Sequence, residues 1–285
     1  MRYPEVLSLS SRPSTIAYAR EDAILYALSV GAGLAPASLD ERDLRFVYEK
    51  DLEVLPSFAT NLLGKDESLL TQAGIDLAHI LHSEQRLTMH KPLPPEGRVT
   101  ASSRVLHVAD KGPDKGAVVH IEHVIADAAS AAPYATVVMT VYCRGNGGFG
   151  GPVDDVFVQY RAPSRSPDHE VRQSTMPNQA ALYRLSIGET TPLHIDPQVA
   201  RQWGFERPLL HGLCTYGFAC RALLDAWCDG VPARMRTLDA RFAAPFYPGE
   251  TLVTRSWRDG GVISFECHSA ERQVTVLRNG RSEIL

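Results

Sequence analysis

The sequence has 285 residues, a length that suits one large domain or two modest ones, each with its own core. Hydrophobic residues make up 44% and charged residues 22%, which is typical of globular proteins and excludes wholesale disorder. The formal net charge of -4 excludes a broad basic field of the kind that binds nucleic acid. We therefore expect two modules.

The sequence lacks clear signs of a membrane span, a targeting signal or disulfide bonds. No run reaches the roughly 18 apolar residues that span a bilayer, and Met1–Glu5 does not open a signal peptide, so we expect a cytosolic protein without a membrane partner. The C-terminus, Ser282–Leu285, is not of the Ser-Lys-Leu type and argues against a peroxisomal location. The cysteines number five and form no CxxC pair, which predicts reduced, mostly buried thiols.

The first half of the chain predicts a helix followed by three strands. Apolar residues at helical spacing run from Arg20 to Gly33, where glycines can close a helix. Three later stretches are rich in valine and threonine and are separated by turn-forming residues, which predicts antiparallel strands at Val99–Ala109, Ala117–Asp127 and Ala135–Cys143.

The second half repeats this plan after a break in the pattern. Gly145–Gly151 and Arg161–Pro177 lack strand-forming residues, so we divide the chain into repeats at 1–150 and 176–285 with a linker at 151–175. The second repeat predicts a helix within Leu210–Asp229 and then strands at Thr251–Arg258, Val262–His268 and Gln273–Arg278. Asn279-Gly280 predicts a tight turn.

Similar motifs precede the two strand sets. Pro92-Leu-Pro-Pro-Glu-Gly resembles Pro245-Phe-Tyr-Pro-Gly-Glu, which indicates an internal duplication. One helix on an antiparallel sheet, made twice, is an α+β arrangement whose two sheets can join edge to edge. The predicted fold is two helix-on-sheet repeats that form one continuous sheet.

The densest polar motif runs from Tyr183 to Pro197. Glycine and prolines within it predict a structured loop, in which Glu189 and His194 are five residues apart. A carboxylate and an imidazole that converge on one reactant suit general acid–base catalysis near neutral pH. The alternative is a turn in which Glu189 is solvated and His194 caps the next helix.

His211-Gly212 opens the apolar helix of the second repeat. Free amides at a helix start can stabilise an oxyanion, and a glycine lets a thioester carbonyl come close, so Gly212 is a candidate donor. The alternative is a glycine that only permits close packing of the helix on the sheet.

Several motifs in order resemble the MaoC-like, R-specific enoyl-CoA hydratase family (hydratase 2). They lie along nearly the whole chain: Leu81–Gln85, Gly147–Gly151, Leu182–Ser186, Pro192–Pro197, Leu210–Gly217, Arg241-Phe242 and Pro248–Leu252. The resemblance implies a double hotdog fold, in which the C-terminal repeat supplies catalytic residues and a degenerate N-terminal repeat accommodates the acyl chain.

The resemblance also implies residue roles. Gly212 would be the oxyanion donor, and four residues match positions that contact the acyl-CoA: His82, Ser83, Lys111 and Phe242. Lys111 also fits on physical grounds, because a cation in a turn can bind a phosphate of coenzyme A. It could equally be a solvated turn lysine, and His82 and Phe242 could be core residues.

The catalytic loop departs from the family pattern Gly-Asp-x-Asn-Pro-Leu-His. Glu189 replaces the aspartate and Thr191 the asparagine, Ile187 is an additional residue, and Ser83 replaces a glycine elsewhere. Glutamate is one methylene longer, and a misplacement of about one ångström can cost on the order of 10²-fold in rate. Threonine cannot both donate and accept as an amide does.

The sequence therefore predicts reversible hydration of trans-2-enoyl-CoA to (3R)-3-hydroxyacyl-CoA, as in fatty acid metabolism. No metal is expected, because the ten histidines form no metal-ligand motif with suitable partners. No redox cofactor is expected either, and coenzyme A is part of the substrate. Two alternatives stay open: an acyl-CoA-binding protein with weakened catalysis, and a hotdog thioesterase. The chain could act as a monomer or a homodimer.

Overall fold

The structure is a computed structural model that describes residues 1–34, 41–63, 68–75 and 80–285. Its centre is one antiparallel sheet of ten strands in the order β1-β3-β4-β5-β2-β7-β10-β9-β8-β6. The strands are β1 (Ser14–Tyr18), β2 (Ile80–Met89), β3 (Gly97–Asp110), β4 (Ala117–Asp127), β5 (Pro133–Cys143), β6 (His169–Ser174), β7 (Thr237–Phe242), β8 (Thr251–Asp259), β9 (Val262–Ser269) and β10 (Val274–Glu283).

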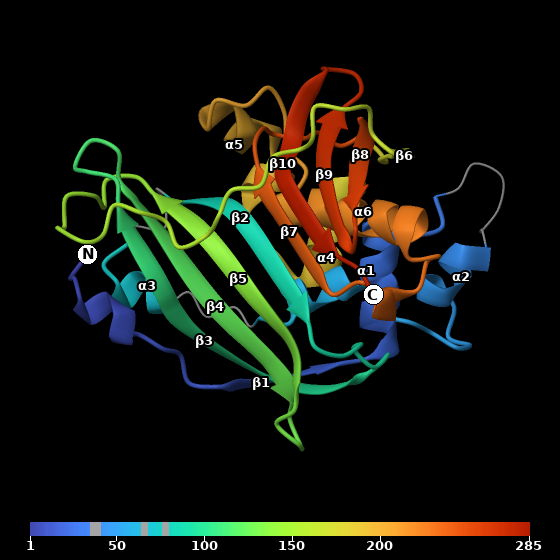
Figure 1. The fold of residues 1–285 in the computed structure, drawn as a ribbon, viewed down its shortest axis with the longest axis horizontal. Helices are drawn as coiled ribbons and strands as arrows, with labels where there is room; N and C mark the ends of the chain where they lie inside the picture. The colour runs from blue at the N-terminus through green and yellow to red at the C-terminus, as the bar shows by residue number, and fades with distance from the viewer. Residues whose placement is uncertain (35–40, 64–67, 76–79) are drawn as a thin grey trace.

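The sheet is two five-stranded halves joined at one seam. Outward from the seam the first half reads β2-β5-β4-β3-β1 and the second reads β7-β10-β9-β8-β6, so the two halves follow the same plan. At the seam β2 and β7 pair antiparallel, with Glu84 opposite Arg241 and Leu87 opposite Leu238. Figure 1 shows the teal-to-green strands and the orange-to-red strands side by side across this seam. The predicted single sheet of two repeats is confirmed.

The helices differ between the repeats. The longest, α6 (Gly212–Trp227), is apolar on almost every side and contacts β6, β7 and β8. Among the described residues of the N-terminal repeat, short elements lie against the sheet: the 3-10 helix η2 (Pro56–Asn61) contacts β2 and β5, and α3 (Ser68–Gln72) contributes to a small apolar cluster with β3, β4 and β5. The remaining helices are α1 (Arg20–Ser29), α2 (Glu41–Val47), α4 (Gln179–Ile187), α5 (Pro197–Gln202), η1 (Glu5–Ser8), η4 (Pro192–His194) and η5 (Pro232–Arg234).

Most predicted elements are confirmed within a few residues. The six predicted strands correspond to β3, β4, β5, β8, β9 and β10, and the helix predicted from Arg20 is α1. However, α1 packs mainly against α4, α2 and η2, so it is not the counterpart of α6 on the first sheet. The predicted linker 151–175 contains β6, which pairs with β8 at the edge of the sheet.

The tight turn predicted at Asn279-Gly280 is wrong. Both residues lie inside β10, where the pairing register shifts and forms a β-bulge. Asn279 adopts a left-handed φ of 54°, and a Cβ at Gly280 would lie 2.4 Å from the Phe265 carbonyl oxygen. In the bulge Asn279 thus takes the left-handed conformation and Gly280 makes room for the Phe265 carbonyl, whereas a type I′ hairpin turn would need both residues left-handed.

Two further sequence predictions concern thiols and membranes. All five cysteines are free and buried, as predicted. Within the ranges that the structure describes, no helix has the length and apolar character needed to cross a bilayer.

Candidate active site

The loop between α4 and α5 carries Glu189 and His194. Gly188 ends α4 in the left-handed conformation, with φ 59°, and Pro192 opens the single turn η4 that holds His194. The next helix, α5, is capped by Asp196, whose side chain accepts from the Gln198 and Val199 amides. His194 therefore does not serve as the cap of α5, and its side chain is available for another role.

The Glu189 carboxylate is held by two donors. The Thr191 backbone amide donates to Oε1 at 2.6 Å, and His211 Nε2 lies 3.2 Å from Oε2. The side chain of Glu189 is 25% exposed, so one edge of the carboxylate still faces solvent. Thr191 thus supports the carboxylate through its backbone amide, which does not require an asparagine side chain, and its own side chain also lowers the pKa of Glu189.

His194 is oriented as a neutral base. Its Nδ1 lies 3.1 Å from the Leu209 carbonyl oxygen, which can only accept, so Nδ1 carries the proton and donates. In the neutral ring Nε2 is then the lone-pair nitrogen. The ring stacks on that of His211 with centroids 3.7 Å apart and planes at 23°.

The surroundings of Glu189, His194 and His211 favour an ionised carboxylate beside two neutral imidazoles. Burial lowers the pKa of His194, and burial together with the neighbouring His194 lowers the pKa of His211 to about 4. Burial alone would raise the pKa of Glu189, but the hydrogen bonds from Thr191 and His211 outweigh it and lower that pKa. At neutral pH the cluster holds one carboxylate and two neutral imidazoles.

Gly212 lies beside this cluster at the first turn of α6. His211 precedes the helix and no side chain caps its N-terminus, so the first amides point outward uncapped. Gly212 itself is exposed, and a Cβ there would lie 3.0 Å from the Phe242 ring. The glycine therefore makes room for Phe242 while its amide stays open to a ligand.

The N-terminal repeat reaches the same place through β2. The His82 ring contacts Phe242 edge-on with centroids 4.9 Å apart, and Phe242 contacts Gly212. Ser83 is turned away, because its hydroxyl donates to the Thr140 carbonyl oxygen at 3.1 Å. Of the predicted substrate residues, His82 and Phe242 adjoin the cluster of Glu189, His194 and His211 across the seam.

Lys111 lies apart from that cluster. It follows β3, which is separated from β2 by β4 and β5, and its Nζ donates to the Val153 carbonyl oxygen at 2.6 Å. A cavity of about 230 Å³ is also distant from the cluster, since it lies at the other end of β2 beside Met89 and Met235. Across the described residues, no cluster of three or more side chains suited to a metal ion is present.

His211 is the site residue that the sequence analysis did not assign. It binds Glu189 from a position 22 residues away, which only the packing of α6 against the α4–α5 loop reveals. One signal was available: an ionisable residue directly before a candidate oxyanion glycine, at the start of a helix, is well placed to reach the same ligand.

The two halves of the chain match two family models. Residues 16–145 match the MFE-2 hydratase 2 N-terminal domain, and residues 158–279 match the MaoC-like domain. A probable enoyl-CoA hydratase 2 of Dictyostelium discoideum is 35% identical over 89% of this chain and 86% of its own length. The peroxisomal multifunctional enzyme type 2 of Mus musculus is 36% identical over 94% of this chain, which spans only 36% of that longer protein.

A solved structure agrees with these matches. The MaoC-like dehydratase from Phytophthora capsici superposes with a TM-score of 0.88 at 30% identity, covering 100% of this chain and 99% of that one. Sequence similarity over both repeats and a shared fold over their full length lead to one assignment. The chain belongs to the MaoC-like hydratase 2 family of hydro-lyases.

Proposed function

We propose that this protein catalyses the reversible hydration of trans-2-enoyl-CoA to (3R)-3-hydroxyacyl-CoA. The observation that carries the proposal is the grouping of a charged Glu189 and a neutral His194 beside the uncapped start of α6. The names of the relatives agree with it, since they include an enoyl-CoA hydratase 2 and a 3-hydroxyacyl-thioester dehydratase.

In the proposed reaction, Glu189 and His194 hold one water molecule by accepting its two protons in hydrogen bonds. The water oxygen bonds to C3 as one of its O–H bonds breaks and that proton passes to the pair. The pair delivers a proton to C2, where the electron pair of the lost double bond forms the new C–H bond, so one water is added in total. The Gly212 amide donates to the thioester oxygen, which is enolate-like during the addition. His211 holds Glu189 in place, and the face of attack follows the family.

Substrate contacts are assigned in part. His82 and Phe242 adjoin Gly212, so they are placed to contact the acyl group near its thioester. The Lys111 ammonium donates a hydrogen bond to the Val153 carbonyl oxygen. A phosphate of coenzyme A would be a stronger, charged acceptor for it. A cytosolic location stays a prediction, because the mouse relative is named as a peroxisomal enzyme.

The first test is the loss of enoyl-thioester absorbance with short, medium and long trans-2-enoyl-CoA esters. Wild type should consume the substrate, whereas Glu189→Gln and His194→Ala should each lose at least 10²-fold in kcat, on the scale of a general acid–base group. Binding without turnover by wild type at every chain length would contradict a hydratase and favour a binding protein. Release of free thiol would favour a thioesterase.

A further inference from the structure

A segment of the linker, residues 152–160, lies across the face of the sheet opposite α6. We call it the covering segment, and Figure 1 shows the chain between β5 and β6 crossing the sheet there. Asp155 pairs with the buried His120 of β4 at 2.9 Å, and the Phe157 ring lies 4.2 Å from the Arg86 guanidinium of β2. These two contacts join the segment to β4 and to the seam strand β2 of the first half, although the segment has no strand of its own.

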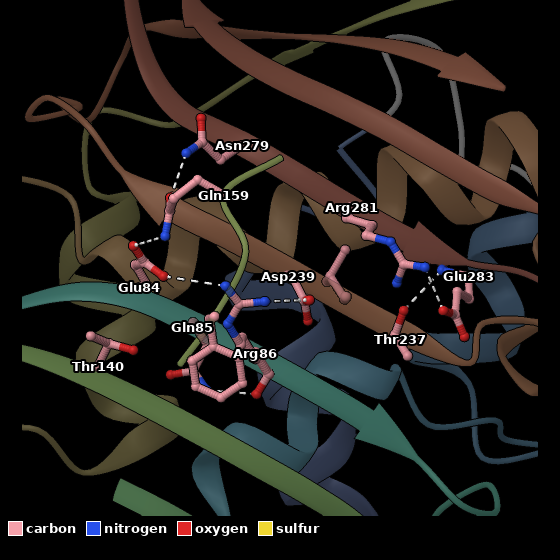
Figure 2. A network of polar contacts seen from close by, with 12 residues as sticks. Glu84, Gln85, Arg86, Thr140, Gln159, Thr237, Asp239, Asn279, Arg281 and Glu283 are labelled. Carbon is pink, nitrogen blue, oxygen red and sulfur yellow. Dashed lines mark hydrogen bonds and ion pairs between the residues drawn. The ribbon is translucent and has the colours of Figure 1, made fainter. Parts of the chain in front are cut away.

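Beneath the covering segment lies Glu84, a carboxylate whose side chain is only 7% exposed. Its oxygens lie 3.5 Å from Arg86, 3.4 Å from Arg241 and 3.1 Å from the Gln159 amide nitrogen of the covering segment. A carboxylate removed from water is stable only when such donors replace the water. Figure 2 shows Glu84 between the Arg86 guanidinium of β2 and Gln159.

The bulge in β10 supplies the last contact of this chain of hydrogen bonds. Asn279 Nδ2 donates to Gln159 Oε1 at 2.6 Å, and Gln159 Nε2 donates to Glu84 Oε1 at 3.1 Å. The left-handed φ of Asn279 directs its side chain toward the covering segment (Figure 2). Asparagine is one of the few residues that adopts this conformation readily, so the bulge and the contact fit one another.

A second bulge lies in β2 between His82 and Glu84, where the pairing with β5 shifts. In a regular strand two residues at this spacing would share a face. Here His82 contacts Phe242 on the side of α6, whereas Glu84 contacts the covering segment on the opposite side. His82 Nε2 also donates to the Glu84 carbonyl oxygen at 3.1 Å, so residue 84 sets the orientation of the ring directly.

Glu84 also acts on Phe242, through Arg241, the residue that precedes Phe242 in the chain. Arg241 lies opposite Glu84 across the seam and binds its carboxylate, and Phe242 follows Arg241 at the end of β7. Residue 84 thus acts on both side chains: its main-chain carbonyl accepts from His82, and its carboxylate binds Arg241, from which the chain continues to Phe242.

We propose that Glu84 is a positioning residue, which fixes His82 and Phe242 against Gly212 from the far side of the sheet, and that Gln159 of the covering segment holds it there. This inference rests on the proposed function for its kinetic consequence only. Neither Glu84 nor Gln159 touches the reacting atoms; they act by setting where the thioester end of the acyl group can lie.

The test compares Glu84→Gln and Gln159→Leu with wild type in steady-state kinetics and in imidazole NMR spectra, where a His82→Gln variant identifies the His82 signals. Both changes should raise KM for the enoyl-CoA about tenfold, with a smaller effect on kcat, because substrate placement and not the acid–base pair is disturbed. The His82 signals should shift in both. Gln159→Leu leaves the carboxylate and both arginines in place, so it tests the proposal even where Glu84→Gln folds poorly.

The matched control is Thr237→Val on the same strand as Phe242. Its Oγ1 accepts from the Glu283 amide at 2.9 Å, so the variant loosens β7 without touching Glu84, and KM and the His82 signals should stay as in wild type. Losses in all three variants that follow their melting temperatures would overturn the proposal, as would unchanged KM and His82 signals in Glu84→Gln and Gln159→Leu. Shifted His82 signals in a protein whose wild type turns over no enoyl-CoA would support the positioning role while refuting the hydratase.

Discussion

The imidazole rings of His194 and His211 stack face to face, with centroids 3.7 Å apart. Two rings at this distance cannot both carry a positive charge at low cost, and each lies in a partly or fully buried position. The stack therefore keeps both histidines neutral at the pH where the protein is proposed to work, and it makes the charge of one depend on the other.

The first prediction is the pH dependence of kcat/KM. Because burial lowers the pKa of His194 below the ordinary value of 6.5, the base form predominates at neutral pH. We expect kcat/KM for an enoyl-CoA to fall on the acidic side with a midpoint below 6.5. A midpoint of loss above 6.5 would contradict a neutral, buried His194 as the essential base.

The second prediction concerns His211. His211→Phe keeps a ring against His194 but removes the donor to Glu189, so the carboxylate loses orientation and burial raises its pKa. We expect kcat to fall by about 10–10²-fold and the acidic limb of the pH profile to move to higher pH. His169→Phe is the control, because His169 packs edge-on against Trp227 away from the site and its loss should leave kcat unchanged.

The third prediction concerns the space between Gly212, at the start of α6, and the Phe242 ring. In Gly212→Ala the new methyl group would lie 3.0 Å from the Phe242 ring, so either the ring or the helix start must shift. We expect kcat/KM to fall by roughly 10²-fold with little loss of stability. Gly261→Ala should be silent in both measurements, since the nearest atom to its Cβ is 3.7 Å away; equal activity in the two variants would refute the role of Gly212.

The fourth prediction concerns Asp239, which pairs with Arg86 at 3.0 Å near the seam. Burial raises its pKa from 3.8 to about 6, against the opposing effect of Arg86. The folded state therefore binds the proton more tightly than the unfolded state, and this stabilising contribution is full below about pH 4 and lost as the pH rises through 6. The shift corresponds to about 3 kcal/mol.

Urea unfolding of wild type and Asp239→Asn at pH 7.5, 6 and 4.5 measures this effect. Asparagine cannot titrate, so the free energy of unfolding of wild type should rise relative to the variant by about 2 kcal/mol as the pH falls from 7.5 to 4.5. A difference between the two proteins that stays constant, or that changes in the opposite direction, would show that Asp239 is ionised throughout.

Much of the sheet could be predicted because several strands between its seam and its edges follow simple rules. Val262–Ser269 alternates buried and half-buried positions, and Ala117–Asp127 is dense in β-branched residues, so both strands are evident in the sequence. The seam strand β2 is not, because Glu84 and Arg86 place charges in its middle. Those charges are satisfied by Arg241 and the covering segment, and no local pattern predicts partners so far along the chain.

The site shows the same division. Glu189 and His194 share one short loop whose prolines and glycine are visible in the sequence, so their convergence could be predicted. Their supports could not: Leu209 orients His194, His211 binds Glu189, and the Thr191 contact includes its backbone amide. Each depends on the packing of α6 or on the conformation of the main chain, which residue identity alone does not determine.

The seam between β2 and β7 has a consequence for how the protein behaves on dilution. Two separate hotdog chains would pair at such an edge to an extent that depends on their concentration, whereas here one chain carries both edges and the pairing is intramolecular. His82 and Phe242, which lie on opposite sides of the seam, are thus held together at any concentration. Specific activity should therefore be independent of protein concentration down to the nanomolar range, where an assembly of single repeats would dissociate and lose its site.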